Sequence, residues 1–303
     1  MSLVQWSHTI RDLARRAGYR VAAVQSGRQQ ASGWIWDATH LVTVEHILSP
    51  RHETLVFTPE GKRLQAQVVG THPGLDLALL RLESEVEVVE IPGRATESLE
   101  VGEFALAVAR SAEDGLGVAG GLIACRSGAW TSCRGGRAEH FLQPDLQLYP
   151  GYSGGPLLDA EGHFLGINTR GLSRGQAITL TSETVAEVVD ALRRGKHQAA
   201  YLGVGLQTVN LPENYSQRWG IESAAMAISL DSNSPASRAG ALLGDILVEL
   251  AGQPVGGTAE VLQLLHNLDV GQVVATRWIR AGQEVQFEIE LGQRPRTGDE
   301  IVE

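Results

Sequence analysis

The stretch Leu148-Tyr149-Pro150-Gly151-Tyr152-Ser153-Gly154-Gly155-Pro156-Leu157 sets one serine among three glycines and two prolines. Glycine permits a positive φ and lets another chain segment approach closely, so the backbone here can turn sharply. Such a turn can expose the Ser153 hydroxyl and gather N–H groups beside it, and acyl transfer needs both a nucleophile and donors for an oxyanion. A plain tight turn between two strands is the alternative, because Gly, Ser and Pro are common in turns.

Short apolar runs separated by turn residues lie on both sides of the serine. We expect strands at 21–24, 33–36, 41–44, 54–58, 64–69, 78–82, 104–109, 116–125, 141–143, 156–158, 164–169 and 177–180. Short strands at this spacing are typical of an all-β barrel or sandwich. The three- and four-residue spacing of apolar side chains predicts a helix at 3–17, and a second at 182–194 with Ser182 as its N-cap.

Length and charge exclude some classes of protein. The chain has 303 residues, which predicts about two domains, and a formal net charge of -10, which argues against nucleic acid or an anionic membrane as the main partner. No run approaches the roughly 20 apolar residues of a membrane span. Residues 1–18 hold several charges and no apolar core, so we predict no signal peptide there. The compartment stays undetermined at this level.

The chain has two cysteines, Cys125 and Cys133, and no pair of histidines close by, so no metal site is predicted. Ser127-Gly128 indicates a hairpin turn that would bring the two thiols face to face. A disulfide outside the cytosol and two reduced thiols are both compatible with this pattern.

Two further stretches carry ionisable groups beside strands. His46, in Leu41-Val42-Thr43-Val44-Glu45-His46-Ile47-Leu48, closes a strand and opens a helical turn, and Asp76 directly precedes the apolar run Leu77–Leu82. Each could be an ordinary surface or turn residue. Together with Ser153 they supply what acyl transfer requires, since the serine needs a base and the base needs a carboxylate that fixes its tautomer. The chain order His, Asp, Ser is known from double β-barrels.

These three motifs, with Gly162-His163-Phe164-Leu165-Gly166-Ile167-Asn168-Thr169 after the serine, resemble the HtrA (Deg) family of trypsin-like serine proteases. The resemblance extends from about Arg20 to Pro295. It implies a mainly β fold, in which a trypsin-like pair of six-stranded barrels with the active site between them is followed by a PDZ domain. We expect an N-terminal helical segment at 1–19, the protease domain at 20–196, the PDZ domain at 201–295 and a tail at 296–303.

The resemblance also assigns roles. His46 would be the general base, Asp76 its orienting carboxylate and Ser153 the nucleophile, while the N–H groups of Gly151 and Ser153, with Tyr152 as a further candidate, would form the oxyanion hole. The family usually has Asn where this chain has Tyr152, whose side chain we expect to point away from the nucleophile. Glu45 adds a carboxylate next to the histidine that the family pattern lacks.

The specificity pocket is predicted to be apolar. Leu148, Leu172 and Ile178 match pocket-lining positions or the loop that shapes the pocket in the family. Gln147 stands six residues before Ser153, where trypsin-like cleavage after Arg or Lys would require Asp.

Residues 201–295 resemble a PDZ domain of the bacterial type, through Asn233-Ser234-Pro235-Ala236 and Gly244-Asp245-Ile246-Leu247. The resemblance makes Tyr201-Leu202-Gly203-Val204 the loop that binds a peptide carboxylate. A peptide would then add as a strand along Val204–Leu206, opposite a helix near 258–268 that carries the groove candidate Leu262. A small αβ domain that merely packs is the alternative.

The predicted function is that of a serine endopeptidase that degrades unfolded or damaged proteins and recognises peptide C-termini. No metal or cofactor is implied. The resemblance implies a homotrimer held by N-terminal aromatic residues, for which Trp6 and Tyr19 are candidates, and a periplasmic or other extracytoplasmic location. The alternative is a PDZ-bearing chaperone or scaffold whose protease domain is inactive at rest.

Overall fold

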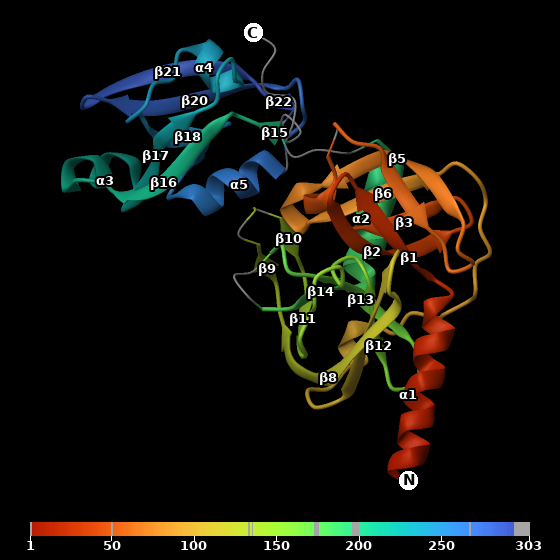
Figure 1. The fold of residues 1–303 in the computed structure, drawn as a ribbon. Helices are drawn as coiled ribbons and strands as arrows, with labels where there is room; N and C mark the ends of the chain where they lie inside the picture. Colours follow the sequence, from red (N-terminus) through yellow and green to blue (C-terminus); the bar gives the residue numbers. More distant parts are fainter. Residues whose placement is uncertain are drawn as a thin grey trace. The chain divides into compact units, whose positions relative to one another are not determined.

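The computed structural model describes residues 2–49, 51–132, 134, 136–172, 176–195, 200–266 and 268–293. These residues fall into two compact units, one within 2–195 and the other within 200–293 (Figure 1). Cys133, and with it the question of a disulfide to Cys125, lies outside the described residues, as does the tail at 296–303.

The first unit begins with a six-stranded closed barrel in the order β1-β2-β3-β6-β5-β4. Its strands are β1 Val21–Ser26, β2 Gln29–Asp37, β3 His40–Thr43, β4 Thr54–Phe57, β5 Arg63–His72 and β6 Leu77–Leu82. Small and branched apolar side chains such as Val24, Ile35, Leu41 and Leu80 fill its interior. Strand β6 is buried on both faces: Leu80 and Leu82 belong to this interior, whereas Leu77 and Leu79 join the core that the two barrels share.

A second closed barrel follows in the order β11-β14-β13-β12-β7-β8. Its strands are β7 Phe104–Ser111, β8 Gly115–Ser127, β11 Phe141–Asp145, β12 Pro156–Asp159, β13 Phe164–Thr169 and β14 Ile178–Thr181. The prediction of two six-stranded barrels is confirmed. The turn with Ser153 lies directly before β12, and β12 and β13 are hydrogen-bonded neighbours, so residues around 153 and around 169 come together.

The hairpin predicted at Ser127-Gly128 is wrong. The end of β8 pairs with β11, with Ser127 opposite Phe141, while β9 Trp130–Thr131 pairs with β10 Arg137–Ala138 in a separate ribbon. Closure of the barrel requires β8 to pair with β11, so the chain leaves the sheet after Ser127 instead of folding back on β8.

Helix α1 (Leu3–Gly18) precedes the first barrel and α2 (Ser182–Arg193) follows the second. The N-cap of α2 is Thr181 and not Ser182 as predicted. Thr181 keeps an extended backbone and its side chain accepts a hydrogen bond from the Thr184 N–H, whereas Ser182 already belongs to the first helical turn. Three short 3₁₀ turns complete the unit: η1 Glu45–Ile47, η2 Pro73–Leu75 and η3 Thr96–Ser98.

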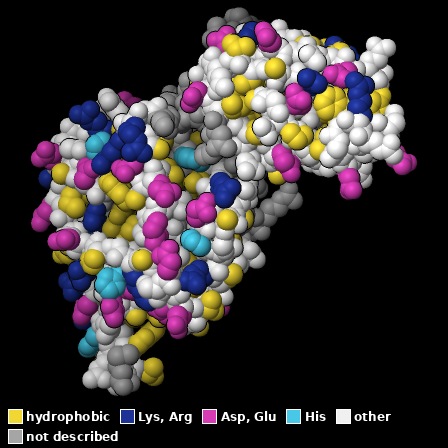
Figure 2. All heavy atoms as spheres, turned by 180° about the vertical axis from the view of Figure 1, so that it is seen from behind, with side chains coloured by type: hydrophobic (Ala, Val, Ile, Leu, Met, Phe, Trp, Pro, Cys, Tyr) yellow, Lys and Arg dark blue, Asp and Glu magenta, His cyan; other side chains and the backbone are white. Residues whose placement is uncertain are grey.

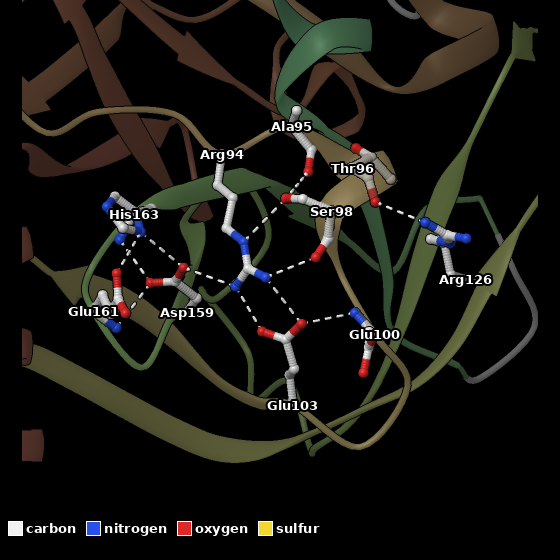
Figure 3. Close-up of polar contacts among 10 residues, drawn as sticks. All are labelled: Arg94, Ala95, Thr96, Ser98, Glu100, Glu103, Arg126, Asp159, Glu161 and His163. Atoms are coloured by element: carbon white, nitrogen blue, oxygen red, sulfur yellow. Dashed lines mark hydrogen bonds and ion pairs between the residues drawn. The ribbon is translucent and has the colours of Figure 1, made fainter.

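The segment between β6 and β7 connects the two barrels, and a polar cluster holds it against the second barrel (Figure 3). The Arg94 guanidinium donates to both Glu103 oxygens, at 2.6 and 3.0 Å, and to Asp159 at 3.2 Å. Asp159 lies at the end of β12, and its Oδ1 accepts the N–H groups of Glu161 and His163 in the turn to β13. The connecting segment and this turn are therefore held by one buried carboxylate.

The second unit is a sheet in the order β16-β17-β18-β20-β21 with three helices. The strands are β16 Val204–Asn210, β17 Ser223–Leu230, β18 Ile246–Leu250, β20 Val273–Arg280 and β21 Gln283–Glu290, and the helices are α3 Glu213–Trp219, α4 Pro235–Ala239 and α5 Thr258–His266. Two short pairs are added: β19 Gln253–Pro254 on β18, and β15 Ala200–Tyr201 with β22 Gly292–Gln293. Trp278, Leu247 and Ile289 are fully buried at its centre. β16 stands at the edge of the described sheet.

Acidic, basic and apolar side chains are interspersed over the face drawn in Figure 2. Among the described residues, no helix has the length and apolar character needed to span a membrane.

Candidate active site

The His46 side chain is held by one carboxylate. β3 ends at Thr43, and the 3₁₀ turn η1 then directs His46 toward Asp76. The His46 backbone N–H donates to Asp76 Oδ1 at 3.0 Å, and its ring Nδ1 lies 2.8 Å from Asp76 Oδ2. Because an ionised carboxylate only accepts, Nδ1 carries the proton and Nε2 is left as the basic nitrogen.

Asp76 is fully buried between the 3₁₀ turn η2 and β6. It adopts a left-handed backbone (φ 54°, ψ 37°), which an aspartate tolerates better than most residues and which aims its carboxylate at η1 instead of along the strand. Its Oδ2 also accepts the Thr169 hydroxyl at 2.5 Å. The sequence alone does not reveal this role of Thr169, since no local pattern shows that it reaches a residue 93 positions earlier.

An ion pair flanks the carboxylate. Arg134 Nη1 lies 3.2 Å from Glu45 Oε2 and 3.5 Å from Asp76 Oδ1. The loop that carries Arg134 is anchored by Ser132, whose hydroxyl donates to Gly74 O at 2.5 Å. The carboxylate that Glu45 adds beside the histidine therefore has a cation within reach.

Ser153 lies in a turn that glycine makes possible. Gly151 and Gly154 both have a positive φ, of 86° and 85°. A Cβ on Gly154 would lie 2.0 Å from the carbonyl oxygen of Ser32, so no other residue fits there. The turn packs that closely because the Ser32 N–H donates to Ser153 O at 2.9 Å.

The segment Thr169–Gly171, at the end of β13, contacts all three predicted catalytic residues. The Thr169 hydroxyl bonds Asp76, and the Arg170 N–H reaches Ser153 Oγ at 3.4 Å. A Cβ on Gly171 would lie 3.0 Å from His46 Nδ1 and 2.3 Å from Asp76 Oδ2, so the backbone of Gly171 lies against the His46–Asp76 pair. Three consecutive residues thus bring Ser153 into the neighbourhood of the pair.

The N–H groups at the turn fall into two kinds. The Tyr152 N–H donates to Tyr149 O at 3.1 Å, so it is engaged within the turn. Within the described part of the chain, the N–H groups of Gly151 and Ser153 have no protein acceptor. Of the three predicted oxyanion-hole donors, only that of Tyr152 is therefore engaged by a described residue of the protein itself.

The Tyr152 side chain packs against β8. A Cβ on Gly117 would lie 2.7 Å from the Tyr152 hydroxyl, and the Tyr152 ring meets the Tyr149 ring edge-on at 5.6 Å. Burial, with a smaller contribution from Tyr149, raises the pKa of Tyr152 above its ordinary value. The side chain therefore serves packing in this structure.

The predicted pocket residues are all buried, but they do not form one group. Leu172 and Ile178 belong to the core between the two barrels, whereas Leu148 packs with Leu157 and Leu165 in another cluster. Residues 173–175 of the pocket-shaping loop lie outside the described residues. The pocket stays a prediction.

In the second unit, the predicted carboxylate loop precedes the edge strand β16. Gly203 has φ 76°, and a Cβ there would lie 2.1 Å from Ser234, so this glycine is required. Two carbonyl groups of the loop hold it in place through hydrogen bonds. Leu202 O accepts the Ala236 N–H and Gly203 O accepts the Asp231 N–H, both at 2.9 Å.

The α5 helix lies beside the same edge strand. Its first residue, Thr258, donates its N–H to the Thr208 hydroxyl on β16 at 3.1 Å. Val261 and Leu265 are buried in the core, while Leu262, one turn after Thr258, is only half-buried. Leu262 therefore shares the helical face of Thr258 that is directed toward β16.

Comparison with known proteins gives two family matches. Residues 31–167 match the model of the trypsin-like peptidase domain, and residues 200–291 match the model of the PDZ domain.

Curated relatives cover most of the chain at modest identity. A protein of Pseudomonas putida (strain GB-1) named "Probable periplasmic serine endoprotease DegP-like" is 28% identical over 84% of this chain. One of the same name from Ectopseudomonas mendocina is 27% identical over 98% of this chain. The chain spans 54% and 62% of the length of these relatives.

Solved structures share the fold. The serine endoprotease from Yersinia pestis matches with a TM-score of 0.65 at 22% identity, over 94% of this chain and 98% of that one. The HtrA-type protease AlgW with decapeptide matches with a TM-score of 0.64 at 23% identity, over 94% of this chain and 99% of that one. At this identity the structures show that the chain has the fold of HtrA-type proteases, as the sequence predicts.

Proposed function

We propose that this chain, which carries a trypsin-like peptidase domain followed by a PDZ domain, is a serine endopeptidase that cleaves unfolded or damaged polypeptides. The observation that carries the proposal is that one short segment contacts all three residues. Thr169 bonds Asp76, Arg170 reaches Ser153, and Gly171 lies against the His46–Asp76 pair. A shared fold alone would not distinguish an active protease from a degenerate one, because function resides in the site.

The proposed reaction is that of a Ser-His-Asp triad. Ser153 Oγ attacks the scissile carbonyl while His46 Nε2 takes the hydroxyl proton, and the same imidazolium then protonates the leaving amine. Asp76 stabilises the imidazolium and keeps the proton on Nδ1, at 2.8 Å. The N–H groups of Gly151 and Ser153 stabilise the oxyanion, and water then hydrolyses the acyl-enzyme with His46 again as the base.

In the PDZ domain we propose that the carboxylate of a peptide C-terminus binds at Tyr201–Val204 and that the peptide pairs with the edge strand β16. Leu262 contacts the peptide from α5. The free edge of β16 and the left-handed Gly203 support this assignment.

Assembly and location complete the proposal. The aromatic side chains of Trp6 and Tyr19 are 44% and 57% exposed, which suits residues that hold a homotrimer together through N-terminal segments. Because the similar curated proteins are named periplasmic, we propose an extracytoplasmic, periplasmic location.

Digestion of an unfolded substrate such as reduced casein tests the activity. Wild type is expected to cleave it and to be labelled by a fluorophosphonate probe, and Ser153→Ala to do neither. Ser111→Ala is the matched control and should behave as wild type, because Ser111 ends β7 and, among the described residues, its hydroxyl bonds only groups of the turn that follows. If wild type neither cleaves nor reacts, even with a PDZ-binding peptide added, but still suppresses aggregation, the chaperone alternative replaces the protease.

A further inference from the structure

Ser32, on β2 of the first barrel, is fully buried and meets the nucleophile turn of the second barrel. Its N–H donates to Ser153 O at 2.9 Å, and its hydroxyl donates to Gly151 O at 2.7 Å. The same hydroxyl oxygen accepts the Arg110 backbone N–H at 2.9 Å, and the Ser32 carbonyl accepts the Thr43 hydroxyl at 2.7 Å. Every polar atom of this residue is therefore used.

The hydroxyl bond fixes one peptide group. The Gly151–Tyr152 peptide is held at its carbonyl by Ser32 and at its N–H by Tyr149 O. Rotation of this peptide would break both hydrogen bonds, and each contributes about 0.5–1.5 kcal/mol net with a larger cost if a buried group stays unpaired. The peptide lies between the two peptides that carry the Gly151 and Ser153 N–H groups. Holding it restrains the Gly151 ψ and Tyr152 φ torsions, through which these two donors are placed relative to each other.

Arg110 determines which way the Ser32 hydroxyl points. Because the Arg110 N–H occupies a lone pair of Ser32 Oγ, the hydroxyl proton is directed to Gly151 O. Arg110 itself is held on the first barrel by its guanidinium, which donates to Val21 O at 2.6 Å and to Gly18 O at 2.8 Å. The orientation of the hydroxyl is thus built into the contact between the barrels.

We infer that Ser32 is a positioning residue for the oxyanion hole: it keeps the Gly151–Tyr152 peptide in the orientation that presents the Gly151 and Ser153 N–H groups to the substrate. This inference rests on the proposed protease function. A purely structural role, in which Ser32 only joins the barrels, would predict a loss of stability without a selective loss of catalytic rate.

Ser32→Ala removes the hydroxyl and keeps the N–H bond to Ser153 O. Removal of one oxyanion donor costs about 10²–10³-fold in kcat, and a misdirected donor costs less, so we expect a loss of about 10- to 100-fold in kcat with KM unchanged. The rate of fluorophosphonate labelling should fall in proportion, since phosphonylation of Ser153 uses the same donors.

Thr43→Val is the matched control, because it deletes a buried hydroxyl bonded to the same residue but leaves Gly151 O untouched. It should lower Tm about as much as Ser32→Ala and keep kcat within twofold. Ser32→Cys, which retains volume and a weak donor, should give an intermediate kcat and serves if Ser32→Ala does not fold.

Two results would overturn the inference: Ser32→Ala or Ser32→Cys with wild-type kcat, or Thr43→Val with an equal loss. These results differ from a failure of the proposed protease function, in which the fluorophosphonate probe would not label the wild type.

Discussion

Two buried aspartates in this protein each bond the Nδ1 of a histidine. Asp76 Oδ2 lies 2.8 Å from His46 and Asp159 Oδ2 lies 2.9 Å from His163, and both residues are at most 2% exposed. Judged by distance and burial alone, the two pairs are the same. The residues around them differ, and the difference separates the proposed catalytic pair from a structural one.

The Asp159 pair is local, and a cation lies beside its carboxylate as Arg134 lies beside Asp76. His163 follows Asp159 by four residues in the β12–β13 turn, and Arg94 adds a cation at 3.2 Å (Figure 3). Burial would raise the pKa of Asp159, but the His163 and Glu161 N–H groups, the His163 ring and Arg94 together lower it. In Figure 3 the groups drawn around this carboxylate are ion-pair and turn partners.

The Asp76 pair joins residues 30 positions apart, and its second carboxylate oxygen accepts the Thr169 hydroxyl. Thr169 belongs to the segment whose next residue, Arg170, contacts Ser153 Oγ. One short segment therefore contacts both the pair and a serine hydroxyl. Within the described residues, the Asp159 pair has no such serine beside it. The lesson is that the third partner, and not the His–Asp contact, identifies the site.

The largest expected contrast comes from the two histidines. His46→Gln should lower kcat/KM by about 10⁶-fold, the effect of losing the base of a serine protease triad. His163→Gln should keep kcat/KM within about threefold, because His163 bonds only turn and ion-pair partners. Initial rates on an unfolded substrate measure both. Equal losses for the two variants would mean that the pairs do not differ in role.

The two aspartates should separate activity from stability. Asp76→Asn is expected to lower kcat by about 10⁴-fold, because the amide favours the wrong imidazole tautomer. Asp159→Asn should keep kcat but lower the free energy of unfolding by about 2–3 kcal/mol, since Arg94 and the turn lose a charged acceptor. Urea denaturation and kinetics on the same preparations check this. A loss of kcat in Asp159→Asn without a loss of stability would contradict it.

The His46–Asp76 pair could be predicted from the sequence, whereas the Asp159–His163 pair and the residues that join the two barrels could not. His46, Asp76 and Ser153 lie in motifs whose order and flanking strands predict the site, and the short apolar runs separated by turn residues indicate the barrels. The sequence assigns no role to Thr169 or Ser32, because their partners stand 93 and 119 residues away and only the packing of one barrel on the other brings them together. The Ser127-Gly128 prediction is wrong for a related reason, since a local turn signal does not say which strand closes a barrel.

The smallest effect concerns pH. The folded-state pKa of Asp159 lies below its ordinary value of 3.8, so its charge stabilises the folded protein above about pH 4. This contribution is lost as pH falls through the lowered pKa. The difference in unfolding free energy between wild type and Asp159→Asn should therefore shrink from pH 7 to pH 3, by at most about 1.4 kcal/mol per pH unit.

Urea titrations across that range measure the difference. Glu161→Gln is the control, because that side chain is 80% exposed and lies 3.7 Å from His163, and its difference from wild type should stay small at every pH. A gap between wild type and Asp159→Asn that is as wide at pH 3 as at pH 7 would show that the shape of the side chain, and not its charge, holds the turn. The charge of Asp159 would then contribute little to stability, and the two aspartates would resemble each other only in their burial and in their distance from a histidine.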